Sequence, residues 1–221
     1  PKEMPLIFGS ILAITILTTA GETFFTTLIV ILSSSYIIIF YMSGKKITTK
    51  FFNRPTLGVA KELLGKYLIR KIGSRIISGK IIETEAYCGP YDLASHASKG
   101  RTKRTEVMFG QPGLIYVYMI YGMYYCLNII TEKENFPAAV LIRAVDLKNC
   151  NGPGKICREF KIDKKFNGLN ISDNGKLWIE NRGERINNKN ISATPRIGID
   201  YAGEYRDKPW RFILAHHTSE S

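Results

Sequence analysis

Apolar positions recur at different periods along the chain, and each period predicts a type of element. Helical spacing from Leu57 to Leu64, between Thr56 as a start residue and Gly65 as a stop residue, predicts a short helix. A second helix is expected over 156–162. Runs rich in β-branched and aromatic residues predict strands over 67–72, 76–87, 114–130 with a break at Tyr121–Gly122, 138–145 and 176–180.

These elements do not alternate as parallel β–α–β units. We therefore expect an α+β fold: a single domain with a curved, mainly antiparallel β-sheet, flanked by helices and carrying a protruding β-hairpin. The turn Gly73–Ser74 joins the first two strands, and the Tyr121–Gly122 break marks the tip of the protruding hairpin.

The amino-terminal segment has a different pattern, because residues 1–41 hold only three charged side chains. The uncharged run 23–44 is long enough to cross a bilayer as a helix, and Lys45 and Lys46 follow it. The alternative is upstream sequence joined to a protein that begins at Met42. We predict that residues 1–41 are an apolar extension foreign to the native protein, with a membrane segment as the alternative.

Charge changes this picture further. The whole chain carries 31 basic and 19 acidic side chains, a net charge of +12, and residues 42–221 account for 30 and 17 of them. Such a surplus favours a polyanionic partner. The four cysteines have no CxxC spacing, so neither a zinc site nor a redox pair is indicated, and we expect no metal and no cofactor.

Two acidic residues and an aromatic one share a face of the predicted strand 76–87. Glu83, Glu85 and Tyr87 alternate with residues of the opposite face. Arg143 is the one charge in the apolar strand 138–145, and a lone arginine there needs a carboxylate or a ligand. Its functional interpretation places it beside Glu83 or Glu85 in a site, and its plainer interpretation is a structural ion pair.

The loop 88–113 and the tyrosine-rich hairpin after it are candidates for nucleic-acid contacts. The loop is basic, turn-rich and centred on His96; its plainer interpretation is a solvated basic loop. Most of the tyrosines are expected in the core, but Tyr121 at the hairpin tip is suited to wedge between stacked bases. A base rotated out of the stack could lie between Tyr87 and Tyr118, with His96 bonding its edge and Glu85 activating a water.

The motifs of the chain resemble those of one known family. They are Glu83-Thr84-Glu85-Ala86-Tyr87-Cys88-Gly89-Pro90, Ser95-His96, Val107-Met108-Phe109, Tyr116-Val117-Tyr118, Tyr121-Gly122-Met123-Tyr124, Asn128, Leu141-Ile142-Arg143-Ala144, Asn151-Gly152-Pro153-Gly154-Lys155 and Arg196-Ile197-Gly198. Over about residues 50–212 the chain is similar to the N-methylpurine DNA glycosylases, also called alkyladenine or 3-methyladenine DNA glycosylases. The resemblance implies hydrolysis of the N-glycosidic bond of damaged purines (3-methyladenine, 7-methylguanine, hypoxanthine, ethenoadenine), which leaves an abasic site.

The resemblance also implies a role for particular residues. Glu85 matches the general base, and Arg143 and the main-chain carbonyl of Ile197 match groups that hold the water. Positions that match the base pocket are Tyr87, His96, Tyr118 and Asn128, the last of which disfavours the exocyclic amine of guanine. Positions that match DNA contacts are the intercalating Tyr121, Met108, Arg101, Arg104 and Lys155.

The implied partner is double-stranded DNA containing damaged purines, bound by a monomer without a metal or cofactor. A bilayer tether would limit access to a chromosome, so we disfavour a membrane anchor and expect a cytoplasmic, nucleoid-associated glycosylase domain over 42–221. Two departures from the family pattern are Thr105, where an asparagine is expected, and the end after Phe212, which indicates either a weakened last strand or a truncated or shifted reading frame.

Two other classes of function fit parts of the sequence. A non-catalytic module could use the same basic loops and tyrosines to bind nucleic acid. A carbohydrate hydrolase could use Glu83 and Glu85, but these lie on the same side of any bond, whereas glycosidases flank the bond with their acids. We therefore rank the hydrolase far below the glycosylase.

Overall fold

The computed structural model of the chain divides into two compact units, Pro1–Lys45 and Lys46–Ser221. It describes residues 14–20, 23–32, 35–42 and 44–215. The first unit contains a three-stranded antiparallel sheet of β1 (Ile14–Ala20), β2 (Thr23–Leu32) and β3 (Ser35–Met42). Within the uncharged run 23–44, residues 23–32 and 35–42 thus form strands instead of a helix. Within the described ranges, no helix is both long and apolar enough to cross a membrane.

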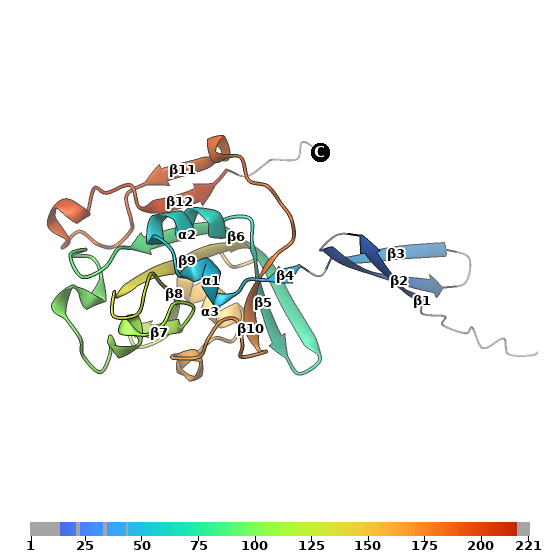
Figure 1. The fold of residues 1–221 in the computed structure, drawn as a ribbon, viewed down its shortest axis with the longest axis horizontal. Coiled ribbons are helices and arrows are strands. Elements are labelled where there is room, and N and C mark those ends of the chain that lie inside the picture. Colours follow the sequence, from blue (N-terminus) through green and yellow to red (C-terminus); the bar gives the residue numbers. More distant parts are fainter. Residues whose placement is uncertain (1–13, 21–22, 33–34, 43, 216–221) are drawn as a thin grey trace, which may run out of the picture. The chain divides into compact units, whose positions relative to one another are not determined.

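The second unit is built on a nine-stranded sheet (Figure 1). Seven of its strands follow the order β4-β10-β5-β6-β9-β8-β7, and the other two branch from it: β12 pairs with β6, and β11 pairs with β12. The strands are β4 (Lys45–Lys46), β5 (Tyr67–Ile72), β6 (Arg75–Tyr87), β7 (Ile115–Ile120), β8 (Tyr124–Thr131), β9 (Ala138–Asp146), β10 (Leu177–Asn181), β11 (Ile191–Thr194) and β12 (Arg211–Leu214). The pairings from β5 to β12 are antiparallel. The expected α+β class and the expected mainly antiparallel sheet are therefore confirmed.

Among the described residues of this unit, three α-helices pack against the sheet: α1 (Thr49–Phe52), α2 (Thr56–Leu63) and α3 (Pro153–Glu159). They contribute Phe52, Leu63 and Ile156, among others, to one apolar core. Helix α3 begins three residues before the predicted start because proline is well suited to the first turn of a helix, where its missing N–H has no partner to lose. Short 3₁₀ helices are η1 (His96–Lys99), η2 (Glu106–Phe109), η3 (Lys164–Phe166), η4 (Asn188–Asn190) and η5 (Gly203–Tyr205).

Strand β6 changes the face that it presents to the core partway along its length. Before the middle of the strand the buried residues are odd-numbered, Ile77 and Ile81, and after it Thr84 and Ala86, which are even-numbered, are buried on the same side. The reversal coincides with register shifts against β9 on either side of Glu83, a bulge that the sequence pattern did not reveal. As a result, Glu83, Glu85 and Tyr87 face away from the helices.

Strands β7, β8 and β9 follow the same alternation. Val117, Leu127 and Ile142 belong to the helix-covered core, whereas neighbours such as Tyr118 and Asn128 line a cavity on the opposite face. The sheet therefore separates the core from the candidate site.

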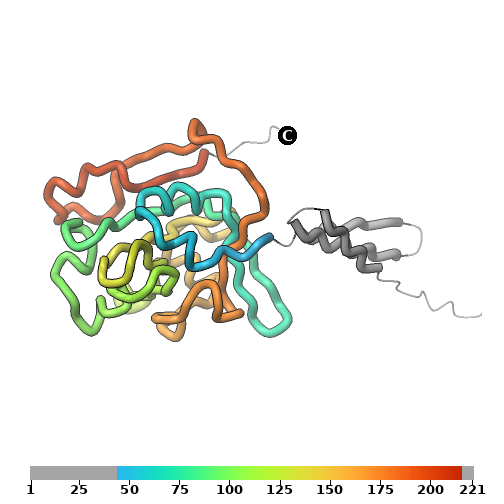
Figure 2. Tube along the Cα trace, in the orientation of Figure 1, coloured from blue at the N-terminus to red at the C-terminus, as the bar shows by residue number. Residues whose placement is uncertain are grey.

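Two long loops close the cavity at the end of the sheet. The segment 88–113 and the segment 195–210 lie side by side in Figures 1 and 2, and Ala94 from the first packs against Ile199 and Ala202 from the second. Contacts between the loops, and not sequence proximity, bring their residues together.

The last described strand is β12, and all four of its residues pair with β11. Ile213 and Leu214 continue β12 in register with β11, and Phe212 and Leu214 are buried. The apolar residues at these positions continue the alternation of the strand. The expected weakening of this strand stays a prediction. Residues 216–221 lie outside the described residues.

Candidate active site

A cavity of about 340 Å³ opens on the face of β7, β8 and β9 that the helices leave uncovered. Its walls include Tyr87, His96, Tyr118, Asn128 and Arg143, which come from different strands and from the loop after β6. These residues lie far apart in the sequence, and the sheet brings them to one place. The cavity thus brings together the residues expected to form a base pocket.

Glu85 is fully buried directly behind this wall. Its Oε2 accepts a hydrogen bond from the Tyr87 hydroxyl at 2.9 Å, and its Oε1 accepts one from the Ile197 amide at 2.9 Å. Arg143 Nη1 lies 3.3 Å from the same Oε1. All three partners line the cavity, so the carboxylate is one side chain away from a bound molecule.

The surroundings of Glu85 alter its affinity for a proton. Burial raises the pKa of Glu85 above its ordinary value, against the opposing effects of Arg143, the Ile197 amide, Tyr87 and Arg196. A carboxylate with a raised pKa accepts a proton more readily than an exposed one. For Ile197, the structure shows the amide on Glu85, which is a contact that sequence reasoning did not include.

Arg143 connects the two acidic residues of β6. Its Nε donates to Glu83 Oε1 at 2.9 Å, and Arg211 Nε donates to the same oxygen at 2.6 Å. The expectation that Arg143 lies beside Glu83 or Glu85 is confirmed, because it contacts both. Glu83 is thus held by two arginines, Arg143 and Arg211.

His96 belongs to an aromatic cluster on the opposite wall. Its Nδ1 lies 3.0 Å from the Tyr116 hydroxyl, and its ring meets Tyr118 edge-on with centroids 4.5 Å apart. Burial, and after it the charge of Arg104, lowers the pKa of His96 to about 4. At neutral pH the ring is therefore uncharged and presents one donor and one acceptor.

Asn128 lies at the floor of the cavity and is almost completely buried. Its Nδ2 donates to the carbonyls of Tyr116 and Cys126 at 3.2 and 3.4 Å. These bonds fix the orientation of the amide against the backbone of β7 and β8. A ligand in the cavity meets a rigid polar group at this point.

Tyr121 stands at the tip of the β7–β8 hairpin and is 86% exposed. Both Tyr121 and Gly122 have positive φ, 51° and 69°, and the Met123 amide donates to the Ile120 carbonyl, as in a type I′ turn. A tyrosine in the left-handed region is uncommon. The expected hairpin tip is present, and the Tyr121 ring also borders the cavity.

The remaining predicted contact residues fall into different environments. Lys155 and Arg104 are exposed; Lys155 bonds Asn151, and Arg104 lies 5.5 Å from the ring centroid of Tyr118. Arg101 is exposed but paired with Glu106. Met108 is 2% exposed and forms part of the cavity wall, so it could meet a bound base but not the outside of a duplex.

Thr105 closes the basic loop in place of the expected asparagine. Its hydroxyl oxygen accepts from the Thr102 amide at 2.8 Å, and the hydroxyl lies 3.0 Å from the Gly100 carbonyl, to which it donates. The threonine therefore still ties the loop to its own backbone.

Sequence reasoning gave no role to three residues of the site, Asp92, Arg196 and Tyr116. Arg196 donates two hydrogen bonds to Asp92, at 2.6 and 2.8 Å, across 104 residues of sequence. In the sequence, Arg196 is recognisable only as an arginine next to Ile197, and Asp92 only as an aspartate in a turn. Neither indicates its partner without the fold.

Nothing in the described part of the chain resembles a metal centre. No group of three or more His, Cys, Asp or Glu side chains among the described residues could hold an ion. The four cysteines are free thiols, and Cys126, Cys150 and Cys157 are buried. Burial raises the pKa of Cys126, which makes its thiol a poor nucleophile.

Known proteins are similar to this chain over most of its length. A family model described as methylpurine-DNA glycosylase matches residues 50–218. A relative from Methanocella arvoryzae is 48% identical over 180 residues, covering 73% of this chain and 88% of its own. Relatives from Legionella pneumophila and Clostridium perfringens are 47% and 44% identical over 175 and 190 residues, covering 77% and 74% of this chain and 94% and 93% of theirs. All three are named provisionally as 3-methyladenine DNA glycosylases.

The chain therefore belongs to the methylpurine-DNA glycosylase family. It is a DNA glycosylase, an enzyme of DNA repair.

Proposed function

We propose that this enzyme excises alkylated and deaminated purines, including 3-methyladenine, 7-methylguanine, hypoxanthine and ethenoadenine, from double-stranded DNA. The observation that carries the proposal is the buried Glu85 carboxylate, which three polar partners hold behind an aromatic-walled cavity. The names of the relatives, which refer to 3-methyladenine, support the same substrate class.

The damaged nucleotide has to leave the helix before it can enter the cavity. Tyr121, exposed at the hairpin tip and bordering the cavity, would fill the gap in the base stack. Arg104 and Lys155, both exposed, would contact the phosphates on either side.

A flipped purine would stack between Tyr87 and Tyr118, both of which line the cavity. Neutral His96 would form a hydrogen bond to an edge of the base, and the fixed amide of Asn128 would crowd the exocyclic amine of guanine. The cavity volume of about 340 Å³ is at the lower end of small-molecule pockets, which suits one purine base.

Hydrolysis needs one base and no covalent intermediate. Glu85 would take a proton from water, the resulting hydroxide oxygen would bond to the sugar C1′, and the electrons of the N-glycosidic bond would leave with the purine. Arg143 and the backbone at Ile197 would hold the water beside Glu85. A cationic or protonated purine is a good leaving group, so the free base and an abasic site are the products.

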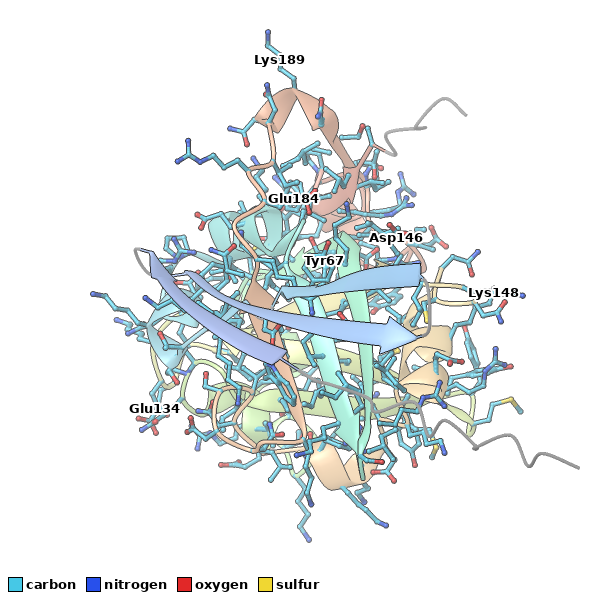
Figure 3. The ribbon with its side chains drawn as sticks, turned by 90° about the vertical axis from the view of Figure 1, so that its right-hand side faces the viewer. Tyr67, Glu134, Asp146, Lys148, Glu184 and Lys189 are labelled. Atoms are coloured by element: carbon cyan, nitrogen blue, oxygen red, sulfur yellow. The ribbon has the colours of Figure 1, made fainter. Side chains whose placement is uncertain are left out.

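The test is release of hypoxanthine from a duplex containing inosine. Glu85→Gln should lower the single-turnover rate by about 100-fold or more, because general-base catalysis contributes that much, while the Kd for the duplex stays close to that of the wild type. Glu134→Gln is the matched control, since Glu134 is an exposed carboxylate at the surface (Figure 3).

The outcomes separate the enzyme from a binding module. Hypoxanthine release by the wild type and by Glu134→Gln, lost in Glu85→Gln with DNA binding retained, supports the proposal. Binding of the duplex without release of any damaged purine by the wild type would leave the non-catalytic module as the better description.

A further inference from the structure

Asp92 and Arg196 form an ion pair whose two side chains are completely buried. Arg196 Nη1 donates to Asp92 Oδ2 at 2.6 Å, and Nη2 donates to Oδ1 at 2.8 Å, so the contact is a planar fork. Burying two charges is costly, and a buried pair is weak evidence for stability by itself. A purely stabilising role is therefore an incomplete account of this pair.

Arg196 also contacts the strand that carries Glu85. Its Nη1 donates to the carbonyl of Ala86 at 2.8 Å, which is the residue between Glu85 and Tyr87. The guanidinium lies 4.8 Å from the ring centroid of Tyr87 and 5.0 Å from that of Trp210, so it is held between two aromatic rings. The position of the Tyr87 ring thus depends on the guanidinium.

The next residue in the chain, Ile197, is the second hydrogen-bond donor to Glu85. The nitrogen of this amide is bonded to the carbonyl carbon of Arg196. The fork from Arg196 to Asp92 therefore also restrains the position of the Ile197 amide. Asp92 in turn accepts from the amides of Cys88 and Ala94, which fixes the loop that follows β6. Both donors to Glu85, the Tyr87 hydroxyl and the Ile197 amide, are consequently held through one guanidinium.

We propose that Arg196, locked by Asp92, is a positioning residue that aligns Tyr87 and Ile197 on the Glu85 carboxylate. It does not touch the bound base or the water. The inference rests on the proposed role of Glu85 as the general base. Lysine cannot replace it, because an ammonium group makes neither the fork to Asp92 nor the planar stack on Tyr87.

The test compares Arg196→Lys with the wild type at a series of pH values, using single-turnover release of hypoxanthine. Arg196→Lys keeps the positive charge but loses the fork, so Glu85 loses well-aligned donors. We expect the rate to fall about 10- to 100-fold and its acid limb to move to higher pH, because fewer hydrogen bonds then favour the carboxylate form. The Kd for the inosine duplex should change less than about threefold, as Arg196 makes no DNA contact in the proposed complex.

The acid limb reports on Glu85 through the groups that face it. These are Arg143 from β9, Tyr87 from β6, Arg196 and the Ile197 amide from the closing loop, with Tyr118 and Cys126 nearby on β7 and β8. Only Arg196 changes in the variant. Arg54→Lys is the matched control, because Arg54 makes a similar fork to Glu62 at the exposed surface.

Asp92→Asn provides a second variant in case Arg196→Lys does not fold; it keeps one of the two oxygens that accept backbone amides and weakens the fork. A lower rate with a displaced acid limb in either folded variant supports the proposal. A lower melting temperature with an unchanged rate and acid limb would make the pair merely structural and overturn it. An equal loss of rate at every pH would also overturn it, since alignment on Glu85 would then not be the cause. Failure of the wild type to release hypoxanthine would instead refute the proposed function.

Discussion

His96 is a histidine without charge at neutral pH, and this property affects both recognition and stability. Burial and the charge of Arg104 lower its pKa from 6.5 to about 4. The neutral ring lies 3.0 Å from the Tyr116 hydroxyl, which can donate to Nδ1 or accept from it according to the tautomer. A cationic imidazole would repel the cationic purines that the enzyme is proposed to excise.

The same pKa predicts how stability depends on pH. Between pH 6.5 and about 4 the unfolded chain binds a proton at His96 that the folded chain does not bind, so the free energy of unfolding decreases as the pH falls through this window. His96→Gln should remove about 1 kcal/mol of that decrease between about pH 7 and pH 5, allowing for solvent screening at a partly exposed ring. Urea denaturation at the two pH values measures it. Equal pH dependence in the variant and the wild type would contradict the assigned protonation state.

Single residues differ in how well the sequence reveals them. Glu85, Tyr87 and Arg143 were found because a short strand pattern places them, and a lone charge in an apolar strand requires a partner. Asp92 and Arg196 were missed because their contact spans 104 residues between two irregular loops, where no periodicity relates one position to the other. Local patterns identify side chains on strands, but loop-to-loop pairs need the fold.

At the scale of elements, the β7–β8 hairpin presents Tyr121 on a rigid tip. The tight turn, with two residues at positive φ, holds the ring 86% exposed instead of letting it collapse onto the sheet. An exposed aromatic ring costs free energy in the isolated protein, and insertion between bases would recover it.

Tyr121→Ala should therefore impair excision most where the base is hardest to extrude. We expect a loss of about tenfold or more for a damaged base in a stable pair and a smaller loss in a weakly paired context, because stacking contributes roughly 1–3 kcal/mol. Single-turnover rates on matched duplexes measure the difference. Tyr91→Ala, which removes another exposed tyrosine, serves as the control. Equal losses in both duplexes would argue against a wedge.

Most elements were predictable because their signals are local. The hairpin strands, both turns and helix α2 lie where the apolar periodicity and the turn residues indicated. Helix α3 begins three residues before the predicted start, because a Gly-Pro-Gly sequence such as 152–154 is also typical of a turn. The sequence pattern does not reveal the bulge in β6, because two successive isoleucines, Ile81 and Ile82, precede Glu83 and leave open which of them faces the core.

For the whole molecule, charge is the property that reaches beyond the cavity. The excess of basic side chains in residues 42–221 favours a polyanion at long range, with an affinity that falls as salt rises. Arg104 and Lys155 are both exposed, one over the ring of Tyr118 and one at the start of α3.

Neutralising these two residues tests their contribution. Arg104→Gln with Lys155→Gln should reduce the slope of log K against log salt by about 1.8, because each phosphate that is no longer neutralised lowers the slope by about 0.9. Fluorescence anisotropy with an undamaged duplex between about 50 and 200 mM salt measures the slope. Lys189→Gln is the control, because Lys189 points into solvent from η4 (Figure 3). The assignment fails if the control changes the slope as much as the double variant does.

The fold class was predictable from the order of elements alone, since hairpins without β–α–β units favour an antiparallel sheet. The branching of the sheet at β6, which pairs with β5, β9 and β12, was not predictable. Such branching depends on which strand returns to an open edge, and no local pattern carries that information.

The bulge at Glu83 has a consequence for how this sequence can change. On β6, the odd-numbered positions before the bulge and the even-numbered positions after it face the apolar interior. A polar substitution is therefore unfavourable at odd-numbered positions in the first part of the strand and at even-numbered positions in the second. A point mutation at any position affects one face. Loss or gain of one residue near Ile82 would exchange the two faces at once and turn Glu85 toward the helices. Substitutions on this strand are therefore constrained one face at a time, whereas an insertion or a deletion disrupts both faces together.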